Sequence, residues 1–301
     1  MRRTGRSAFD ILPRGIQDGV VDPLTAAREV AASLDLDAGD AVVVRDLRTA
    51  VVHLRPAPVV ARVAPAEEEA VVRRQVEVTA HLAARDAPVA APWAEPGPYL
   101  AGDRVVTLWS YVDHDPEAAQ DGRAAGRALR EVHDALADLE DGDLPVFPRL
   151  DDVRRILPTL DVDPDEAELL AQMLALAEVA VEAVDAPVQV VHGDAWLGNV
   201  LWAPAGPLWS DFELTCVAPR ELDLACNETS TRDRGRTPED DALLAGYGEH
   251  DAGLRRRLEA LELVPLTAWT YQLAAAKPAY VDLARRRLAW ALGGLRSTPQ
   301  G

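Results

Sequence analysis

Lysine is almost absent from this chain of 301 residues, because Lys277 is the only lysine among 31 basic residues. Cysteine occurs only twice, at Cys216 and Cys226, and this spacing forms no CxxC pair. So few cysteines exclude a disulfide framework and favour a reducing cytoplasm, with both side chains buried as small hydrophobic groups. Asparagine also occurs only twice, at Asn199 and Asn227.

The sequence also lacks an excess of positive charge and any long apolar run. Its net charge is −19, which argues against nucleic acid as a partner, since phosphate binding needs a basic face. The basic start at residues 1–15 has no apolar run behind it, so no secretory signal is expected. The least polar C-terminal stretch, 263–281, contains two prolines and a lysine, so it predicts no membrane span. We expect a soluble cytoplasmic protein, and nothing in the sequence specifies its oligomeric state.

A length of 301 residues exceeds the usual size of one hydrophobic core, so one large or two closely associated domains are expected.

The pattern in the first third of the chain predicts a small antiparallel sheet with helices. Helical periodicity predicts helices at 24–36 and 66–85. Three β-branched runs separated by short turns predict a meander, and a further strand candidate follows, giving strands at 41–44, 50–54, 59–64 and 104–112.

From residue 116 onward the pattern is mainly helical. The exception is 187–214, which predicts a strand, a loop, a second strand, a Gly-Pro turn and a third strand. A β-rich first lobe is therefore joined to a helical second lobe that carries one hairpin. Helices are predicted at roughly 117–139, 151–157, 164–184, 239–247, 251–261 and 266–292.

The predicted hairpin carries polar residues that a folding core does not need. Asp194 follows His-Gly, Asn199 lies five residues later, and Asp211 precedes a phenylalanine at the end of the next strand. Asn199 and Asp211 offer the hard oxygen ligands that Mg²⁺ prefers. Protein kinases have the same spacing, in which the first aspartate positions the attacking hydroxyl and the other two residues hold metal.

These residues carry a resemblance to a known family. His192-Gly193-Asp194, Asn199 and Asp211-Phe212-Glu213 resemble the aminoglycoside phosphotransferase and choline kinase-like enzymes, which have HGDxxxxN where protein kinases have HRDxxxxN. The segments VVTLWSYV, RALREVHDAL and PRELDLA are similar to the strand and hinge, the following helix, and the segment after the metal aspartate. The resemblance covers about residues 40–290.

The resemblance implies an α+β, two-lobed protein kinase-like fold. It implies a nucleotide-binding lobe at 1–108, a hinge at 109–113 and a helical lobe at 114–301. The implied activity moves the γ-phosphate of ATP or GTP, with Mg²⁺, to a hydroxyl of a small molecule. Asp194 is the implied catalytic residue, and Asn199 and Asp211 are the implied metal ligands. His192 is expected to hold the loop by hydrogen bonds, and Gly193 to permit a backbone turn.

The phosphate-binding end departs from the usual kinase pattern. Kinases use a strand lysine paired with a helix glutamate, but Lys277 lies near the C-terminus. The matching strand position is Arg62, whose guanidinium is always charged and binds phosphate in a planar fork. The alternative for Arg62 is a solvated charge on an edge strand. The matching helix position is Gln75, which could accept a hydrogen bond from Arg62 but without a charge, so weaker nucleotide anchoring is expected.

The remaining nucleotide contacts are expected at the hinge and at the first turn. Backbone groups of Ser110 and Val112 match the positions that hold adenine, and Trp109 is either the bulky residue behind that pocket or a plain core residue. No glycine occurs in the turn that should cover the phosphates, so Arg48 and Thr49 are the candidates there.

Charge suggests a class of acceptor. Residues 1–108 have 13 Arg against 15 Asp and Glu, whereas residues 109–301 have 18 Lys and Arg against 35 Asp and Glu, a net charge of −17. A negative site would concentrate a cationic acceptor, such as an amino sugar or an aminoalcohol. The acids cluster at 113–121 and 239–251, and the aromatics Trp269, Tyr280 and Trp290 are predicted on one face of the last helix. The alternatives are solvated acidic faces and core packing.

Two other functions compete with a small-molecule kinase. A nucleotide-binding pseudokinase with a regulatory role would explain Gln75 and the missing lysine, but such a protein has little use for Asp194, Asn199 and Asp211 together. A metal-dependent hydrolase would need clustered histidines, and the six histidines show neither HxH nor HExxH spacing.

Overall fold

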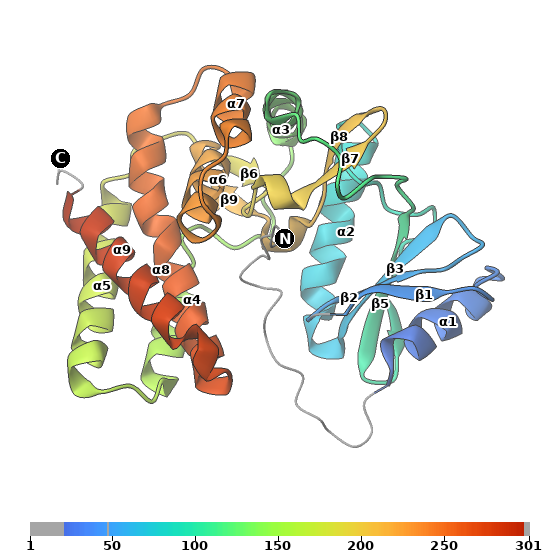
Figure 1. Cartoon of the computed structure of the whole chain (residues 1–301), viewed down its shortest axis with the longest axis horizontal. Helices are drawn as coiled ribbons and strands as arrows, with labels where there is room; N and C mark the ends of the chain where they lie inside the picture. Colours follow the sequence, from blue (N-terminus) through green and yellow to red (C-terminus); the bar gives the residue numbers. More distant parts are fainter. Residues whose placement is uncertain (1–20, 47, 298–301) are drawn as a thin grey trace.

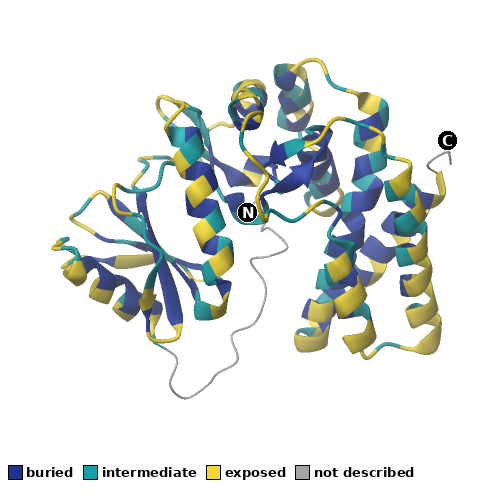
Figure 2. Cartoon of the chain, turned by 180° about the vertical axis from the view of Figure 1, so that it is seen from behind, coloured by how far each residue is buried: buried dark blue, intermediate teal, exposed yellow. Residues whose placement is uncertain are grey.

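The computed structural model of the chain describes residues 21–46 and 48–297. The basic N-terminal stretch considered above lies outside these residues. The sheet and the helix α1 (Pro23–Ser33) form one end of the molecule, and a group of helices forms the other end, with the helix α2 (Glu69–Ala83) between them (Figure 1). In both parts, the sides of helices and strands that face other elements are mostly buried, and the sides that face outward are mostly exposed (Figure 2).

The sheet is antiparallel throughout and has the strand order β1-β2-β3-β5-β4. The short strand β4 was not predicted, whereas the other four lie where the β-branched runs predict them. The strands are β1 (Val42–Asp46), β2 (Ala50–His53), β3 (Val59–Pro65), β4 (Tyr99–Ala101) and β5 (Arg104–Ser110).

The two faces of β3 point to different surroundings. Val59, Ala61 and Val63 are buried in one core with the helix α1 (Pro23–Ser33). Because successive side chains of a strand point to opposite faces, Arg62 faces away from that core. The helix α2, preceded by the short turn η2 (Ala66–Glu68), packs Val72 against Ala64 and Val105. The arginine therefore projects from the face opposite α1.

The second lobe is built from helices. α3 packs closely on α7, and α4, α5, α8 and α9 form the group farthest from the sheet (Figure 1). Their bounds are α3 (Gly122–Leu136), α4 (Leu150–Ile156), η3 (Leu157–Thr159), α5 (Pro164–Glu182), α6 (Glu221–Arg234), α7 (Pro238–Tyr247), α8 (Ala252–Ala276), η6 (Pro278–Tyr280) and α9 (Val281–Ser297).

The helix prediction was wrong at 266–292. The structure has α8 running through Pro265 and ending at Ala276, and a separate α9 begins at Val281. Lys277 is extended because it precedes Pro278, and a residue before proline avoids the helical region. Trp269, Tyr280 and Trp290 therefore lie on α8, η6 and α9 rather than on one helix.

Two small sheets lie between the lobes. β6 (Gln189–Val191) pairs with β9 (Cys216–Ala218), and β7 (Val200–Ala203) pairs with β8 (Gly206–Trp209). The short turns η4 (Leu197–Asn199) and η5 (Phe212–Leu214) lie before β7 and after β8. Cys216 and Cys226 are both buried and free, as predicted. Among the described residues, no helix combines the length and the apolarity needed to cross a bilayer.

Candidate active site

The loop between β6 and β7 is held by a buried histidine. His192 is fully buried, its Nε2 lies 2.9 Å from the carbonyl oxygen of Ser210, and its Nδ1 lies 3.3 Å from the amide of Asp194. A carbonyl can only accept and an amide can only donate, so the neutral ring with its proton on Nε2 satisfies both. Burial lowers the pKa of His192, which favours the same neutral form. His192 holds the loop in place.

The next residue allows the chain to turn. Gly193 has φ +81°, a conformation that glycine adopts without strain. A Cβ at this position would lie 2.1 Å from the carbonyl oxygen of Leu214. Any side chain would therefore push η5 away from the loop.

A buried aspartate that the sequence analysis did not single out anchors this loop. Asp223 on α6 is completely buried and accepts hydrogen bonds from the amides of His192 at 2.9 Å and Gly193 at 2.8 Å. Its Oδ2 also lies 2.7 Å from Nε2 of His133, whose Nδ1 faces the Tyr247 hydroxyl. Burial acts to raise the pKa of Asp223, but the hydrogen bond and charge of His133, together with His192 and the Gly193 amide, outweigh it and the pKa is lowered. The signal was an aspartate between two leucines in PRELDLA.

Asp194 and Asn199 are joined directly. The Asn199 side-chain amide donates to the Asp194 backbone oxygen at 2.7 Å and to Asp194 Oδ2 at 3.0 Å. Asn199 is buried, whereas Asp194 is half-buried. The amide thus fixes the orientation of the carboxylate and leaves the amide oxygen of Asn199 for another partner.

Asp211 is brought to the same place by the hairpin. The amide of Ser210 donates to the Asn199 backbone oxygen at 2.9 Å. This hydrogen bond holds the next residue, Asp211, near Asn199. Asp211 has φ 70°, a left-handed conformation that aspartate tolerates better than most residues. No cluster of three or more His, Cys, Asp or Glu suited to a metal occurs within the described ranges. One carboxylate and one amide oxygen fit Mg²⁺ that takes its other ligands from water and substrate phosphates.

Arg62 faces these groups from the sheet. Its guanidinium donates to Asp211 Oδ1 at 2.8 Å and to Glu213 Oε1, and Arg45 lies 3.9 Å from Asp211 Oδ2. Burial would raise the pKa of Asp211, but Arg62 lowers it. Burial and the neighbouring Asp211 raise the pKa of Glu213. Arg62 is therefore a partly buried, paired cation on an inner strand rather than a solvated charge at a sheet edge.

A model of the phosphotransferase enzyme family matches residues 44–261 of the sequence. The chain belongs to this family. Among curated proteins, none matches the sequence. The family match spans the sheet, the hairpin and most of the helical lobe, including each residue of the site described above.

Solved structures of kinases and phosphotransferases share the fold. Amicoumacin kinase hAmiN in complex with AMP-PNP, Ca²⁺ and Ami has a TM-score of 0.71 at 12% identity, covering 91% of this chain and 94% of that one. A choline/ethanolamine kinase family protein from Mesorhizobium loti has a TM-score of 0.62 at 21% identity, covering 91% and 94%. Aminoglycoside phosphotransferase APH(3'')-Id from Streptomyces rimosus has a TM-score of 0.60 at 19% identity, covering 83% and 99%. The two-lobed kinase-like fold predicted from the sequence is confirmed.

The α2 residue that was expected to contact Arg62 does not do so. Gln75 is buried on α2 and its Oε1 has no hydrogen-bond partner. In the part of the chain that the structure describes, the Arg62 guanidinium bonds to Asp211 and Glu213 and not to Gln75. Glu213 thus supplies a carboxylate to Arg62 from the segment that carries Asp211. The role of Gln75 in nucleotide binding stays a prediction.

The residues predicted to form the hinge lie at the end of β5. Ser110 is the last residue of the strand, and its amide donates to the Ala91 oxygen at 3.0 Å. The Val112 oxygen faces Nδ1 of His114 at 2.8 Å, whereas the Val112 amide makes no hydrogen bond within the described residues. A free hinge amide is the kind of group that the adenine prediction needs. Trp109 is buried, with its Nε1 donating to Thr107.

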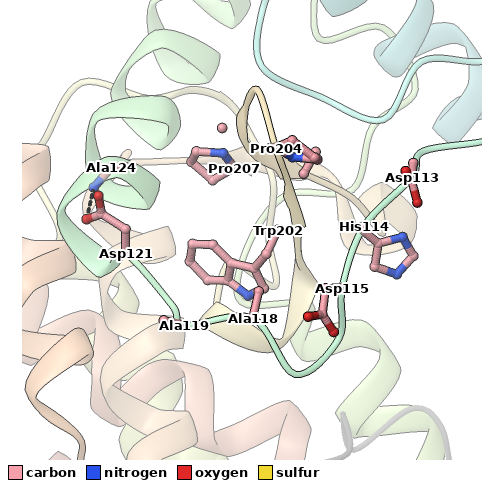
Figure 3. Close-up of a pocket in the computed structure, with 12 residues that line it drawn as sticks. Asp113, His114, Asp115, Ala118, Ala119, Asp121, Ala124, Trp202, Pro204 and Pro207 are labelled. Carbon is pink, nitrogen blue, oxygen red and sulfur yellow. Dashed lines mark hydrogen bonds between the residues drawn. The ribbon is translucent and has the colours of Figure 1, made fainter.

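The predicted acidic clusters have different surroundings. Asp113, Asp115 and Asp121 line a cavity of about 460 Å³ together with Trp202, and the sticks in Figure 3 show them around it. Asp121 also caps α3 through the Ala124 amide. The residues that line this cavity do not include Asp194, Asn199 or Asp211.

The second acidic cluster is used inside the helical lobe. Asp240 is completely buried, pairs with Arg234 and forms a capping box with Thr237. Asp251 caps α8 through the amides of Gly253 and Leu254. These two carboxylates stabilise helix ends, so the local charge that an acceptor meets differs from the net charge of the lobe.

Proposed function

We propose that this protein is a nucleotide- and Mg²⁺-dependent kinase that transfers the γ-phosphate of ATP or GTP to a hydroxyl of a small molecule in the cytoplasm. The observation that carries the proposal is the joining of Asp194 to Asn199 on one hairpin, with Asp211 beside them and Arg62 facing Asp211. A positioned carboxylate, two hard oxygen ligands and a phosphate-binding cation are the parts that phosphoryl transfer needs.

In the proposed reaction, each residue has a separate task. The acceptor hydroxyl donates its hydrogen bond to Asp194, which orients the oxygen toward the γ-phosphorus and takes its proton. The new bond joins that oxygen to phosphorus as the bond from the γ-phosphorus to the bridging oxygen breaks and the nucleoside diphosphate leaves. Asn199 and Asp211 would hold Mg²⁺, whose charge lowers the cost of negative charge on the phosphate oxygens.

Arg62 would exchange its partners when the nucleotide binds. It is paired with Asp211 and Glu213, and a phosphate is an equally good acceptor for a guanidinium. This exchange would free Asp211 to hold Mg²⁺ together with Asn199, and Glu213 would keep a counter-charge near the arginine. The carboxylate that Gln75 cannot provide is then supplied from η5.

The acceptor class proposed from the sequence is a hydroxylated amine. The helical lobe has a net charge of −17, and a negative field attracts a cation over several ångströms. Solved structures with the same fold include APH(3'')-Id in complex with ADP and streptomycin and a choline/ethanolamine kinase family protein. Both observations favour an amine and neither specifies the carbon skeleton.

One observation favours the alternative of a regulatory pseudokinase. The unpartnered Oε1 of Gln75 means that the helix does not fix Arg62 as the usual glutamate would. The test is an ADP-release assay with Mg²⁺ and ATP or GTP against amino sugars, aminoalcohols and neutral sugars. ADP formation that depends on one acceptor supports the kinase. Nucleotide binding without acceptor-dependent ADP formation would support the pseudokinase.

A further inference from the structure

A second cavity lies next to the proposed reaction centre. It has a volume of about 570 Å³ and is lined by residues of α2, α4, η5 and α8. Two of its lining residues, Glu213 and Leu214, follow Asp211 by two and three positions. The other charged residues that line it are Arg48, Arg74, Arg149, Asp152 and Arg155. Four guanidinium groups thus face one cavity in a protein whose net charge is −19.

Two of the four arginines have carboxylate partners. Arg48 pairs with Glu68 at 2.7 Å, and Arg155 pairs with Asp152 at 2.5 Å. The acid Glu213 is already bound to Arg62. The charges of these residues are therefore compensated by contacts within the protein.

The other two arginines have no such partner. Neither Arg74 nor Arg149 lies within ion-pair distance of a carboxylate in the described residues, and Arg149 donates instead to the Leu214 backbone oxygen at 2.8 Å. Burial lowers the pKa of Arg149, and repulsion from Arg74 adds to this effect, although Cys216, Asp152 and Asp194 oppose it. Neither guanidinium is held in an ion pair among the described residues, so both can bind an added anion, and their planar forks suit carboxylate and phosphate.

We propose that this cavity receives the acceptor and that Arg74 and Arg149 bind a carboxylate or phosphate group of it. Val71, Ile156 and Trp269 line the same cavity and would contact the carbon skeleton. The inference rests on the proposed function because it assigns the acceptor of that reaction. It narrows the acceptor to a hydroxy compound with an acid group, and an amine on the same molecule is compatible with it.

Matched pairs of compounds test the acid group. Ethanolamine and L-serine differ by a carboxylate, and D-glucosamine and D-glucosamine 6-phosphate differ by a phosphate. In the ADP-release assay, the acid member of at least one pair should have a KM lower by about tenfold or more, because a guanidinium–carboxylate hydrogen bond is charge-assisted. Equal KM values within both pairs would contradict the proposal.

The variant Arg74→Gln separates this cavity from the nucleotide site. It should raise the KM of the acid member by about 10- to 100-fold and leave the KM of ATP and of the amine-only member unchanged. Arg73→Gln is the matched control, because Arg73 is the adjacent residue on α2, is exposed and pairs with Glu69. A higher KM for ATP in Arg74→Gln would overturn the proposal and assign the arginine to the nucleotide.

Direct binding keeps the test independent of turnover. Inorganic phosphate is titrated calorimetrically into the protein saturated with Mg²⁺ and AMP-PNP, so that the nucleotide phosphates already fill their own site. Binding that Arg74→Gln weakens and Arg73→Gln does not supports an anion site, even if no acceptor releases ADP and the kinase proposal fails. Phosphate binding that is absent, or equal in all three proteins, refutes it.

Discussion

At the scale of single residues, replacing each of the two hairpin aspartates should change turnover and nucleotide affinity differently. Asp194→Ala should lower kcat by about 10²–10⁴-fold with little change in nucleotide affinity, since the carboxylate is proposed to bind the acceptor hydroxyl. Asp211→Ala should weaken Mg–nucleotide binding as well as turnover, because Asp211 is proposed to hold the Mg²⁺ that accompanies the nucleotide. Steady-state kinetics and nucleotide titration with and without Mg²⁺ distinguish the two. Near-normal turnover of Asp194→Ala would remove it from the reaction.

Arg62 should contribute to the binding of the nucleotide phosphates and not to the binding of the base. Arg62→Ala is expected to reduce affinity for ATP by about 10- to 100-fold and to leave adenosine affinity nearly unchanged. Arg62→Lys should recover part of the loss, because it keeps the charge but not the planar fork. Equal losses for ATP and adenosine would mean that Arg62 only holds Asp211 and Glu213 in place.

His192 should make the stability of the fold depend on pH. Its pKa is lowered in the folded protein from 6.5, so the unfolded chain binds a proton more readily. The neutral ring therefore contributes stability at and above about pH 6.5, and this contribution is lost as the pH falls below that value. The fall in Tm from pH 7.5 to 5.5 should be smaller in His192→Gln than in the wild type. His250→Gln, at a partly exposed histidine, is the control, and equal slopes would contradict the prediction.

At the scale of elements, α6 supports the loop that carries Asp194. Asp223→Asn leaves one carbonyl oxygen where two carboxylate oxygens accept hydrogen bonds from His192, Gly193 and His133. At least one buried donor loses its partner, which costs on the order of 1–3 kcal/mol. Denaturant unfolding should show this loss, and kcat should fall more than KM rises because the loop that holds Asp194 shifts. Asp282→Asn, on the exposed first turn of α9, should change neither; a loss of stability without a change in kcat would make Asp223 purely structural.

The sequence predicted best the elements whose signals are local. The strands β1, β2, β3 and β5 have β-branched runs bounded by turns, and the HGDxxxxN spacing lies within one loop, so neither depends on distant contacts. α6 was missed because it is buried on most sides and includes Asp223, Asn227 and Glu228 at buried positions, which hides any amphipathic period. β4 and β9 have three residues each and at most one β-branched residue, whereas the equally short β6 contains Val190 and Val191 and was predicted.

Contacts between distant residues could not be predicted in the same way. The pairing of Arg62 with Glu213 joins residues 151 apart, and the bond from Gly193 to Asp223 joins residues 30 apart. The sequence therefore indicated that Arg62 needed a carboxylate, and pointed to Gln75 as its neighbour, but not that η5 would supply the acid. The fate of the acidic cluster at 239–251 likewise depends on caps and ion pairs that only the fold defines.

At the scale of the whole molecule, the long-range field and the local cavity act on an acceptor with opposite signs. The helical lobe has a net charge of −17, whereas the cavity beside the reaction centre has two arginines without carboxylate partners. The field acts on net charge over a distance that salt shortens to about 10 Å at 0.1 M, but a guanidinium in contact with an acid is screened much less. A cation is thus attracted to the lobe, and an acid group is recognised only at contact.

Salt separates these two effects. The value of kcat/KM for ethanolamine, which is a cation, should fall as NaCl rises from 0.02 to 0.5 M on the order of several-fold, because screening removes its attraction to the lobe. For L-serine, which has no net charge, kcat/KM should change little over the same range and should still depend on Arg74. A neutral sugar alcohol is the control for effects of salt on the nucleotide. If kcat/KM for ethanolamine does not change with salt, the negative field of the lobe does not contribute to acceptor selection. If kcat/KM for L-serine depends strongly on salt, the net charge of the acceptor does not explain the salt effect.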